Sequence, residues 1–127
     1  MGSFSQFYFA GGFFMHIITL TALAAISCFA MAWRQHAAGE HPSALLGLAD
    51  RLAWICLAEG LMGALFGWFD LCMALRTLPP DIDPAIAALR GAGLVPIPIA
   101  WALMVTIPLW TATGVLRVRA ASSLPRA

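Results

Sequence analysis

Charge is what this sequence has least of, and lysine is missing altogether. Charged residues make up 10 % of the 127 residues, and the seven basic ones are all arginines. Soluble domains carry about 25 % charged residues. Hydrophobic residues make up 61 %, which is more than a chain of this length can hide from water in its own core. The sequence therefore predicts a protein that lies in lipid, and the net charge of +1 implies no nucleic-acid partner.

Residues that carry catalytic or metal chemistry are also scarce. The three cysteines have no metal-binding spacing and lie in apolar runs, which indicates small buried side chains. No nucleophile–base set, phosphate-binding loop or metal-ligand pattern is present, so we predict neither an enzyme nor a metal site. The uncharged N-terminal stretch MGSFSQFYF argues against a signal peptide.

Three long apolar runs predict an all-α integral membrane protein with three transmembrane helices. Each run is long enough to cross about 30 Å of hydrocarbon. The predicted spans are residues 13–33, 52–76 and 92–116. They form a single domain over residues 1–127, in which residues 117–127 are a basic C-terminal tail.

Two polar loops separate the spans. We interpret the first, RQHAAGEHPSALLGLADR, as a loop or a short surface helix. In the second, Asp83 followed by Pro84 predicts the N-terminus of a short helix, because Asp is a favoured N-cap and Pro a favoured first residue. Within the third span, Pro108 is expected to kink the helix.

The distribution of arginine predicts the orientation of the chain. The first loop with its edges and the C-terminal tail hold five arginines: Arg34, Arg51, Arg117, Arg119 and Arg126. The opposite side holds two, Arg76 and Arg90. Because short cytoplasmic segments are enriched in basic residues, we predict that the N-terminus lies outside and the C-terminus in the cytoplasm.

Two acidic residues interrupt the second apolar run, in AEGLMGALFGWFD at residues 58–70. On a helix, Glu59 and Asp70 differ by about 20° in direction and about 16 Å along the axis, and Gly63 lies on the same stripe. Gly63 and Gly67 also form the G-x-x-x-G pattern of close helix packing. A charge in mid-membrane costs at least about 2.5–3.5 kcal/mol. We therefore predict that the stripe faces another helix, a cavity or another copy.

The role of the two acids stays open at this point. They are either proton or ion carriers, or counter-charges for a basic partner, or they are structural groups that lock helices together. Asp70 lies near Arg76, so it is also consistent with a position close to the membrane surface. Glu59 follows Leu52 by about seven residues, which predicts a shallow position on the inner side.

His16 lies within the first span. One hypothesis is a hydrogen bond to Asp70, which would satisfy both groups in lipid and set the charge of the imidazole. The other is a hydrogen bond to a backbone carbonyl. A haem or chlorophyll ligand is a third interpretation, but no other residue supports it, so no cofactor is predicted.

Short motifs in all three spans follow a recognisable order. The first span carries a Gly-Gly pair, a Met and a closing basic residue, at Gly11, Gly12, Met15 and Arg34. The second carries GLMGALFG, and the third carries Ile107-Pro108 about forty residues later. This order resembles the MotA/TolQ/ExbB proton-channel family, whose ExbB-type second span reads G-L-x-G-T-V-x-G. The matching positions are Gly60, Leu61, Gly63 and Gly67.

The resemblance implies a homo-oligomeric ring, typically a pentamer, around the single-span helices of an ExbD/TolR-like partner in the bacterial inner membrane. The proton-motive force then drives work at the cell envelope, such as protein transport. Two features depart from the family. The large cytoplasmic region between the first two spans is missing, and the pore-lining Thr positions correspond to Ala64 and a position near Ile99. Thr106 and Thr113, on one helix face, are other sources of hydroxyl groups.

Two hypotheses for function follow. The first is an ExbB/TolQ-like subunit of a proton-motive-force-coupled complex that packs around a single-span partner helix. The second is a non-conducting structural or accessory subunit of a larger membrane complex, which the two departures favour. The candidate ion-path or partner-contact residues are Glu59, Asp70, His16, Thr106 and Thr113. The candidate helix-packing residues are Gly60, Gly63, Gly67 and Pro108.

Overall fold

The computed structural model describes residues 12–40 and 43–122, and these residues are helical apart from the connections between helices. The helices are α2 (Gly12–Ala37), α3 (Ser43–Arg76), α4 (Pro84–Ala92) and α5 (Ile97–Ser122). Three segments are long and apolar enough to cross a membrane: α2, α3, and α4 continued by α5. The predicted class, an all-α protein with three membrane-spanning helices, is thereby confirmed.

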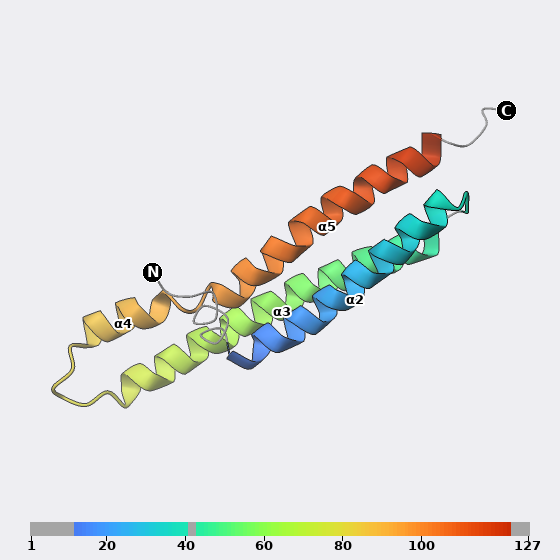
Figure 1. The fold of residues 1–127 in the computed structure, drawn as a ribbon. Helices are drawn as coiled ribbons and strands as arrows, with labels where there is room; N and C mark the ends of the chain where they lie inside the picture. The colour runs from blue at the N-terminus through green and yellow to red at the C-terminus, as the bar shows by residue number, and fades with distance from the viewer. Residues whose placement is uncertain (1–11, 41–42, 123–127) are drawn as a thin grey trace.

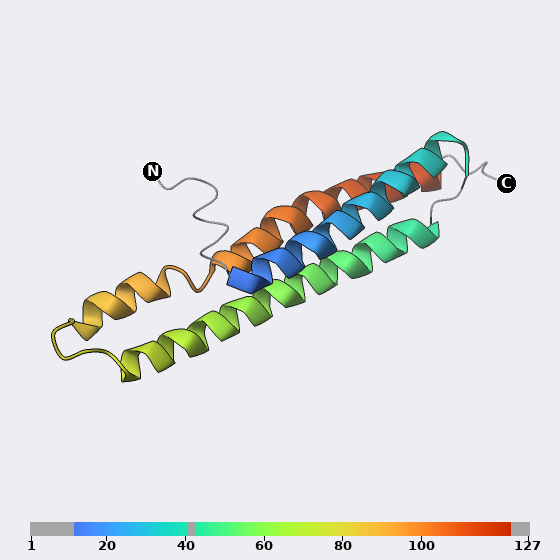
Figure 2. The same cartoon turned by 60° about the horizontal axis from the view of Figure 1, so that its bottom comes forward.

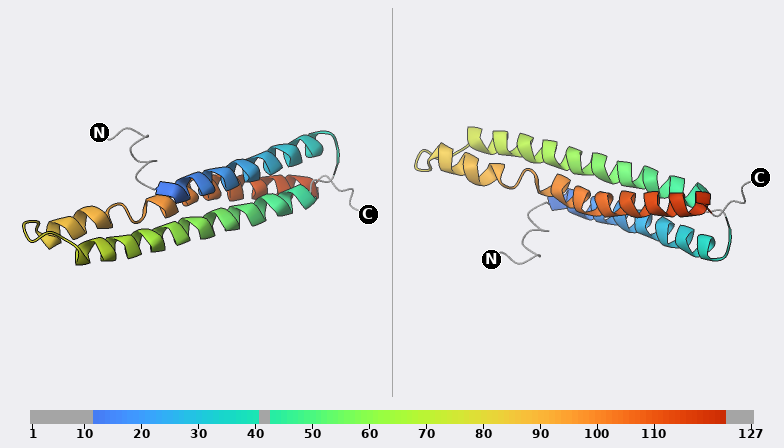
Figure 3. Two further views of the ribbon diagram at one scale, coloured as in Figure 1. Left: turned by 90° about the horizontal axis from the view of Figure 1, so that it is seen from below. Right: turned by 90° about the horizontal axis from the view of Figure 1, so that it is seen from above.

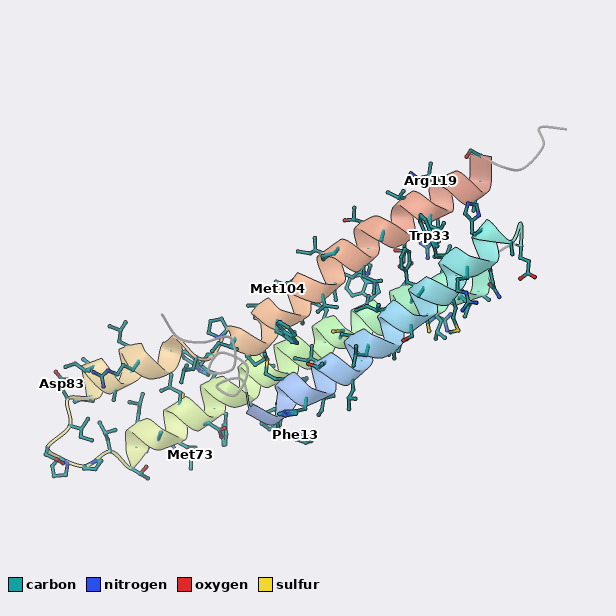
Figure 4. All side chains as sticks on the ribbon, viewed as in Figure 1. Phe13, Trp33, Met73, Asp83, Met104 and Arg119 are labelled. Carbon is teal, nitrogen blue, oxygen red and sulfur yellow. The ribbon has the colours of Figure 1, made fainter. Side chains whose placement is uncertain are left out.

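The long helices form an elongated bundle in which α3 packs against both α2 and α5 (Figure 1). The chain reverses direction after α2 and again after α3, so α2 and α5 run parallel to each other (Figures 2 and 3). Figure 4 shows Trp33 and Arg119 at one end of the bundle, here called the turn end. It shows Met73 and Asp83 at the other end, here called the α4 end, where α3 and α4 project past the start of α2.

Helix α3 begins at Ser43, earlier than the predicted start of the second span at residue 52. Much of the stretch interpreted as a loop or a short surface helix is therefore part of α3. The reversal takes place around Gly39, whose φ of 81° is a conformation that glycine adopts readily. With 34 residues, α3 is about 51 Å long, well above the roughly 30 Å of a hydrocarbon core. The extra length places Asp50 and Arg51 inside a helix.

The predicted short helix in the second loop is confirmed as α4. The side chain of Asp83 caps it by accepting a hydrogen bond of 2.9 Å from the backbone N–H of Ala85, and Pro84 is its first residue. The third long helix, α5, then begins at Ile97 rather than at residue 92. It continues through Pro108, whose ring is exposed rather than packed between helices.

The interior of the bundle is built largely from small residues. Buried alanines lie on all three long helices: Ala22, Ala25, Ala32, Ala49, Ala53 and Ala102. Large apolar side chains such as Leu20, Leu65 and Met104 are exposed instead. In lipid, apolar bulk gains nothing by burial, whereas small residues let helices approach closely and gain van der Waals contact. The distribution is thus the one expected of a membrane bundle.

Candidate functional site

Two glycines of α3, Gly60 and Gly63, lie in close contact with the neighbouring long helices. A Cβ atom added to Gly60 would lie 2.6 Å from the Cβ of Ala102 in α5. One added to Gly63 would lie 2.8 Å from the Cβ of Pro98 and 3.0 Å from the Cβ of Phe14. At Gly67 the nearest atom would be 3.7 Å away, an ordinary contact. Gly60 and Gly63 therefore pack α3 against helices of the same chain.

Glu59 is bound into the contact between α2 and α3. The hydroxyl of Thr21 donates a hydrogen bond of 2.9 Å to Oε1 of Glu59. The other carboxylate oxygen, Oε2, is buried and has no hydrogen-bond partner among the described residues. The carboxyl group is thus held by one oxygen and left unsatisfied at the other.

This contact places Glu59 beside the apolar run of α2. Its partner Thr21 lies within the apolar run of α2, about 12 Å along the helix from Phe13 and about 18 Å from Trp33. One turn before Glu59, the thiol of Cys56 lies 3.7 Å from the carbonyl oxygen of Ile18. Glu59 thus lies opposite the apolar run of α2, and its shallow depth in the membrane stays a prediction.

Asp70 lies on the same stripe as Glu59 but is exposed, because α2 does not extend far enough to cover it. The ring of Phe14, near the start of α2, stacks on Phe66 with 5.4 Å between ring centroids. Asp70 is one turn beyond Phe66, whereas His16 lies on the opposite side of Phe14. The two are therefore separated by about 9 Å along the bundle axis. This separation argues against the hypothesis of a hydrogen bond between His16 and Asp70.

The two candidate threonines of α5 both face the interior. Thr106 is 0 % exposed, and its hydroxyl has no partner among the described residues. The hydroxyl of Thr113 lies 3.1 Å from Oδ1 of Asp50 and 3.1 Å from the carbonyl oxygen of Trp110. Neither threonine lines the outer surface of the bundle, where another copy would pack.

The sequence patterns did not predict a polar cluster that lies at the turn end. The guanidinium of Arg117 in α5 forms an ion pair with Asp50 in α3, and Thr113 donates to the same carboxylate. Asp50 was not singled out because its segment was interpreted as a loop or a short surface helix, and Arg117 was interpreted as part of the tail. An acid placed just before the second apolar run, with an arginine just after the third, was the available signal.

We expect Asp50→Asn to lower the free energy of unfolding by about 0.5–1 kcal/mol, the range of partly exposed ion pairs. Asparagine keeps an acceptor for Thr113 and removes only the charge. A double-mutant cycle with Arg117→Gln should show that the two effects are not additive. Arg119→Gln, a change at the same end of α5, is the matched control. Full additivity in the cycle would contradict the ion pair.

The described residues offer little other chemistry. Within residues 12–40 and 43–122, no three His, Cys, Asp or Glu side chains gather as metal ligands would. Cys28, Cys56 and Cys72 are free thiols. The outward faces of α3 and α5 carry large apolar side chains, among them Leu61, Leu65, Leu103, Met104 and Ile107. Glu59 is thus an ionisable side chain that faces α2 inside the bundle.

Together, the fold and the polar contacts define a helical membrane protein with three spans and a carboxyl group inside the bundle. The chain matches no protein-family model, and comparisons with curated proteins and with solved structures give no match.

Proposed function

We propose that the chain is an ExbB/TolQ-like subunit of a proton-motive-force-coupled complex of the bacterial inner membrane. Its N-terminus lies outside, and its C-terminus lies in the cytoplasm. Several copies, five by resemblance, surround a single-span ExbD/TolR-like helix. In this proposal Glu59 is the residue that binds and releases the proton.

The observation that carries the proposal is the half-satisfied carboxyl group of Glu59. Buried side-chain oxygens are nearly always hydrogen-bonded, since leaving one unpaired is costly. An ionisable side chain inside the membrane is expensive and is retained mainly where it does something. Thr21 holds Oε1 and orients the group, while Oε2 has no described partner. That free oxygen is available to a proton.

The positions of the glycines that match the ExbB-type second span support the same proposal. Gly60 and Gly63 lie at the contacts of α3 with α5 and α2, and Gly67 lies within ordinary contact distance of Val95. These are the glycines shared with the ExbB-type second span. They fix the packing within one copy, so contacts between copies and with a partner helix use the exposed apolar faces of the bundle.

The apolar outer surface favours the second candidate, a non-conducting accessory subunit. Thr106 and Thr113 are buried within the chain, whereas Leu61, Leu103 and Ile107 are exposed. A pore between copies would then have no hydroxyl lining from these positions. This candidate keeps the helix packing and the partner but assigns Glu59 a structural role.

Native mass spectrometry of the complex extracted in mild detergent tests the assembly. We expect about five copies of the chain with a single-span subunit that carries an acidic residue in its membrane helix. A single copy attached to a larger, unrelated assembly would overturn the ring and favour the accessory subunit. Proton flux in reconstituted vesicles separates a conducting ring from a non-conducting one.

A further inference from the structure

A groove of about 530 Å³ opens at the α4 end of the bundle, where α2 begins and α3 continues beyond it. Aromatic rings and glycines line much of it, including Phe14, Phe66 and Gly67. Of the described residues that line the groove, Asp70 is the one with a charge. The groove is therefore an apolar channel with a carboxylate along its wall.

The position of the groove spans two depths of the membrane. Gly63 and Pro98, which line it, are buried between the helices. Asp70 lies about 10 Å further along α3, beyond the start of α2 at Gly12. Since the apolar run of α2 begins at Phe13, the inner part of the groove lies at the depth of acyl chains. We take Asp70, which lies six residues before Arg76 at the end of α3, to be at the level of the lipid headgroups.

We propose that this groove binds a bilayer phospholipid with a primary ammonium headgroup. The acyl chain runs along Phe14 and Phe66 toward Gly63, in a space whose few polar partners make it unfavourable for water. The ammonium group pairs with the carboxylate of Asp70 through a charge-assisted hydrogen bond.

The charge of the lining selects this occupant. A carboxylate without a basic residue in the lining attracts a cationic group and repels an anionic headgroup that has no ammonium. A groove open to the bilayer is also surrounded by lipid at high concentration. The inference does not depend on proton coupling, and it holds for a conducting or an accessory subunit.

Native mass spectrometry after reconstitution with phosphatidylethanolamine or phosphatidylglycerol tests the site. We expect the wild type to retain phosphatidylethanolamine about tenfold better than phosphatidylglycerol, the preference that one charge-assisted hydrogen bond supplies. Asp70→Asn should lose this preference. Asp81→Asn, which removes an acid of the neighbouring loop that does not line the groove, should keep it.

A second variant tests the groove itself. Gly67→Leu should fill it and reduce retention of both lipids, since a Cβ at Gly67 makes only ordinary contacts. Gly114→Leu, at an exposed position on α5 with no atom near its Cβ, is the matched control. An unchanged preference in Asp70→Asn overturns the proposal, and it remains decisive even if Gly67→Leu fails to fold. Unchanged retention of both lipids by folded Gly67→Leu would also overturn the proposal. A second copy of the chain or residues 1–11 would then be the better candidates for the occupant of the groove.

Discussion

Replacing Gly60 by alanine is expected to lower the free energy of unfolding by about 1–3 kcal/mol, the usual cost of overpacking. The new Cβ would lie 2.6 Å from the Cβ of Ala102 and 3.1 Å from the backbone Cα of Ile99. To remove this overlap, the backbones of α3 and α5 must move apart. Contacts along both helices are then lost. Gly63→Ala should behave similarly, because Pro98 and Phe14 leave no room there. Unfolding in mixed detergent micelles, followed by circular dichroism, measures the effect.

Two other glycines provide matched controls for this experiment. A Cβ at Gly114 would meet nothing within 4 Å, and one at Gly67 would meet Val95 at 3.7 Å. Gly114→Ala should therefore be neutral or stabilising by up to about 1 kcal/mol, because alanine favours the helix over glycine. Gly67→Ala should be close to neutral. Equal stability of Gly60→Ala and Gly114→Ala would contradict the close approach of α3 and α5. The larger change Gly63→Leu should prevent α3 from packing against α2 and α5, so that the chain does not fold.

Replacing Glu59 by glutamine is expected to abolish proton-coupled transport while leaving the complex assembled. Glutamine has nearly the same volume and keeps a carbonyl oxygen to accept the hydrogen bond from Thr21. It cannot bind and release a proton. In proteoliposomes containing the whole complex, proton flux under an imposed pH gradient should fall to the level of protein-free vesicles. The mass of the extracted complex should not change.

Two variants make the result for Glu59 interpretable. Asp81→Asn removes an acidic residue outside the long helices and should leave proton flux unchanged. Thr21→Val removes the donor to Oε1 and should reduce flux less than Glu59→Gln, because the carboxyl group remains. Full flux in Glu59→Gln would exclude Glu59 from the proton path. If the complex also assembled normally, the accessory subunit would then be the better description.

Much of the fold was predictable from the sequence because it depends on local and compositional properties. Apolar run length predicted three spanning helices, and the Asp83-Pro84 pair predicted the start of α4. The helix ends were less predictable. Charged residues suggested that the second span begins at Leu52, yet α3 already includes Asp50. The ion pair with Arg117, a residue distant in sequence, lets the helix carry that charge.

The residues of the candidate site were predictable from the sequence, but their arrangement in space was not. Periodicity placed Glu59, Gly63 and Asp70 on one stripe of a helix, and the stripe exists. The environments of Glu59 and Asp70 differ because α2 covers Glu59 but does not reach as far as Asp70. The register between helices decides this, and it arises from packing of Gly60 and Gly63 against specific residues of α2 and α5.

By itself, the sequence determined that the chain is helical, that lipid is its solvent, and that an acid and glycines share one face of the second long helix. These properties follow from residue type and from the 3.6-residue period, which need no knowledge of neighbours. Only the tertiary structure decided that Glu59 is paired with Thr21, that Asp70 lies in an open groove, and that Asp50 binds Arg117. Those relations join residues far apart in the chain, so they depend on how far each helix extends and how closely its small residues let the next one approach.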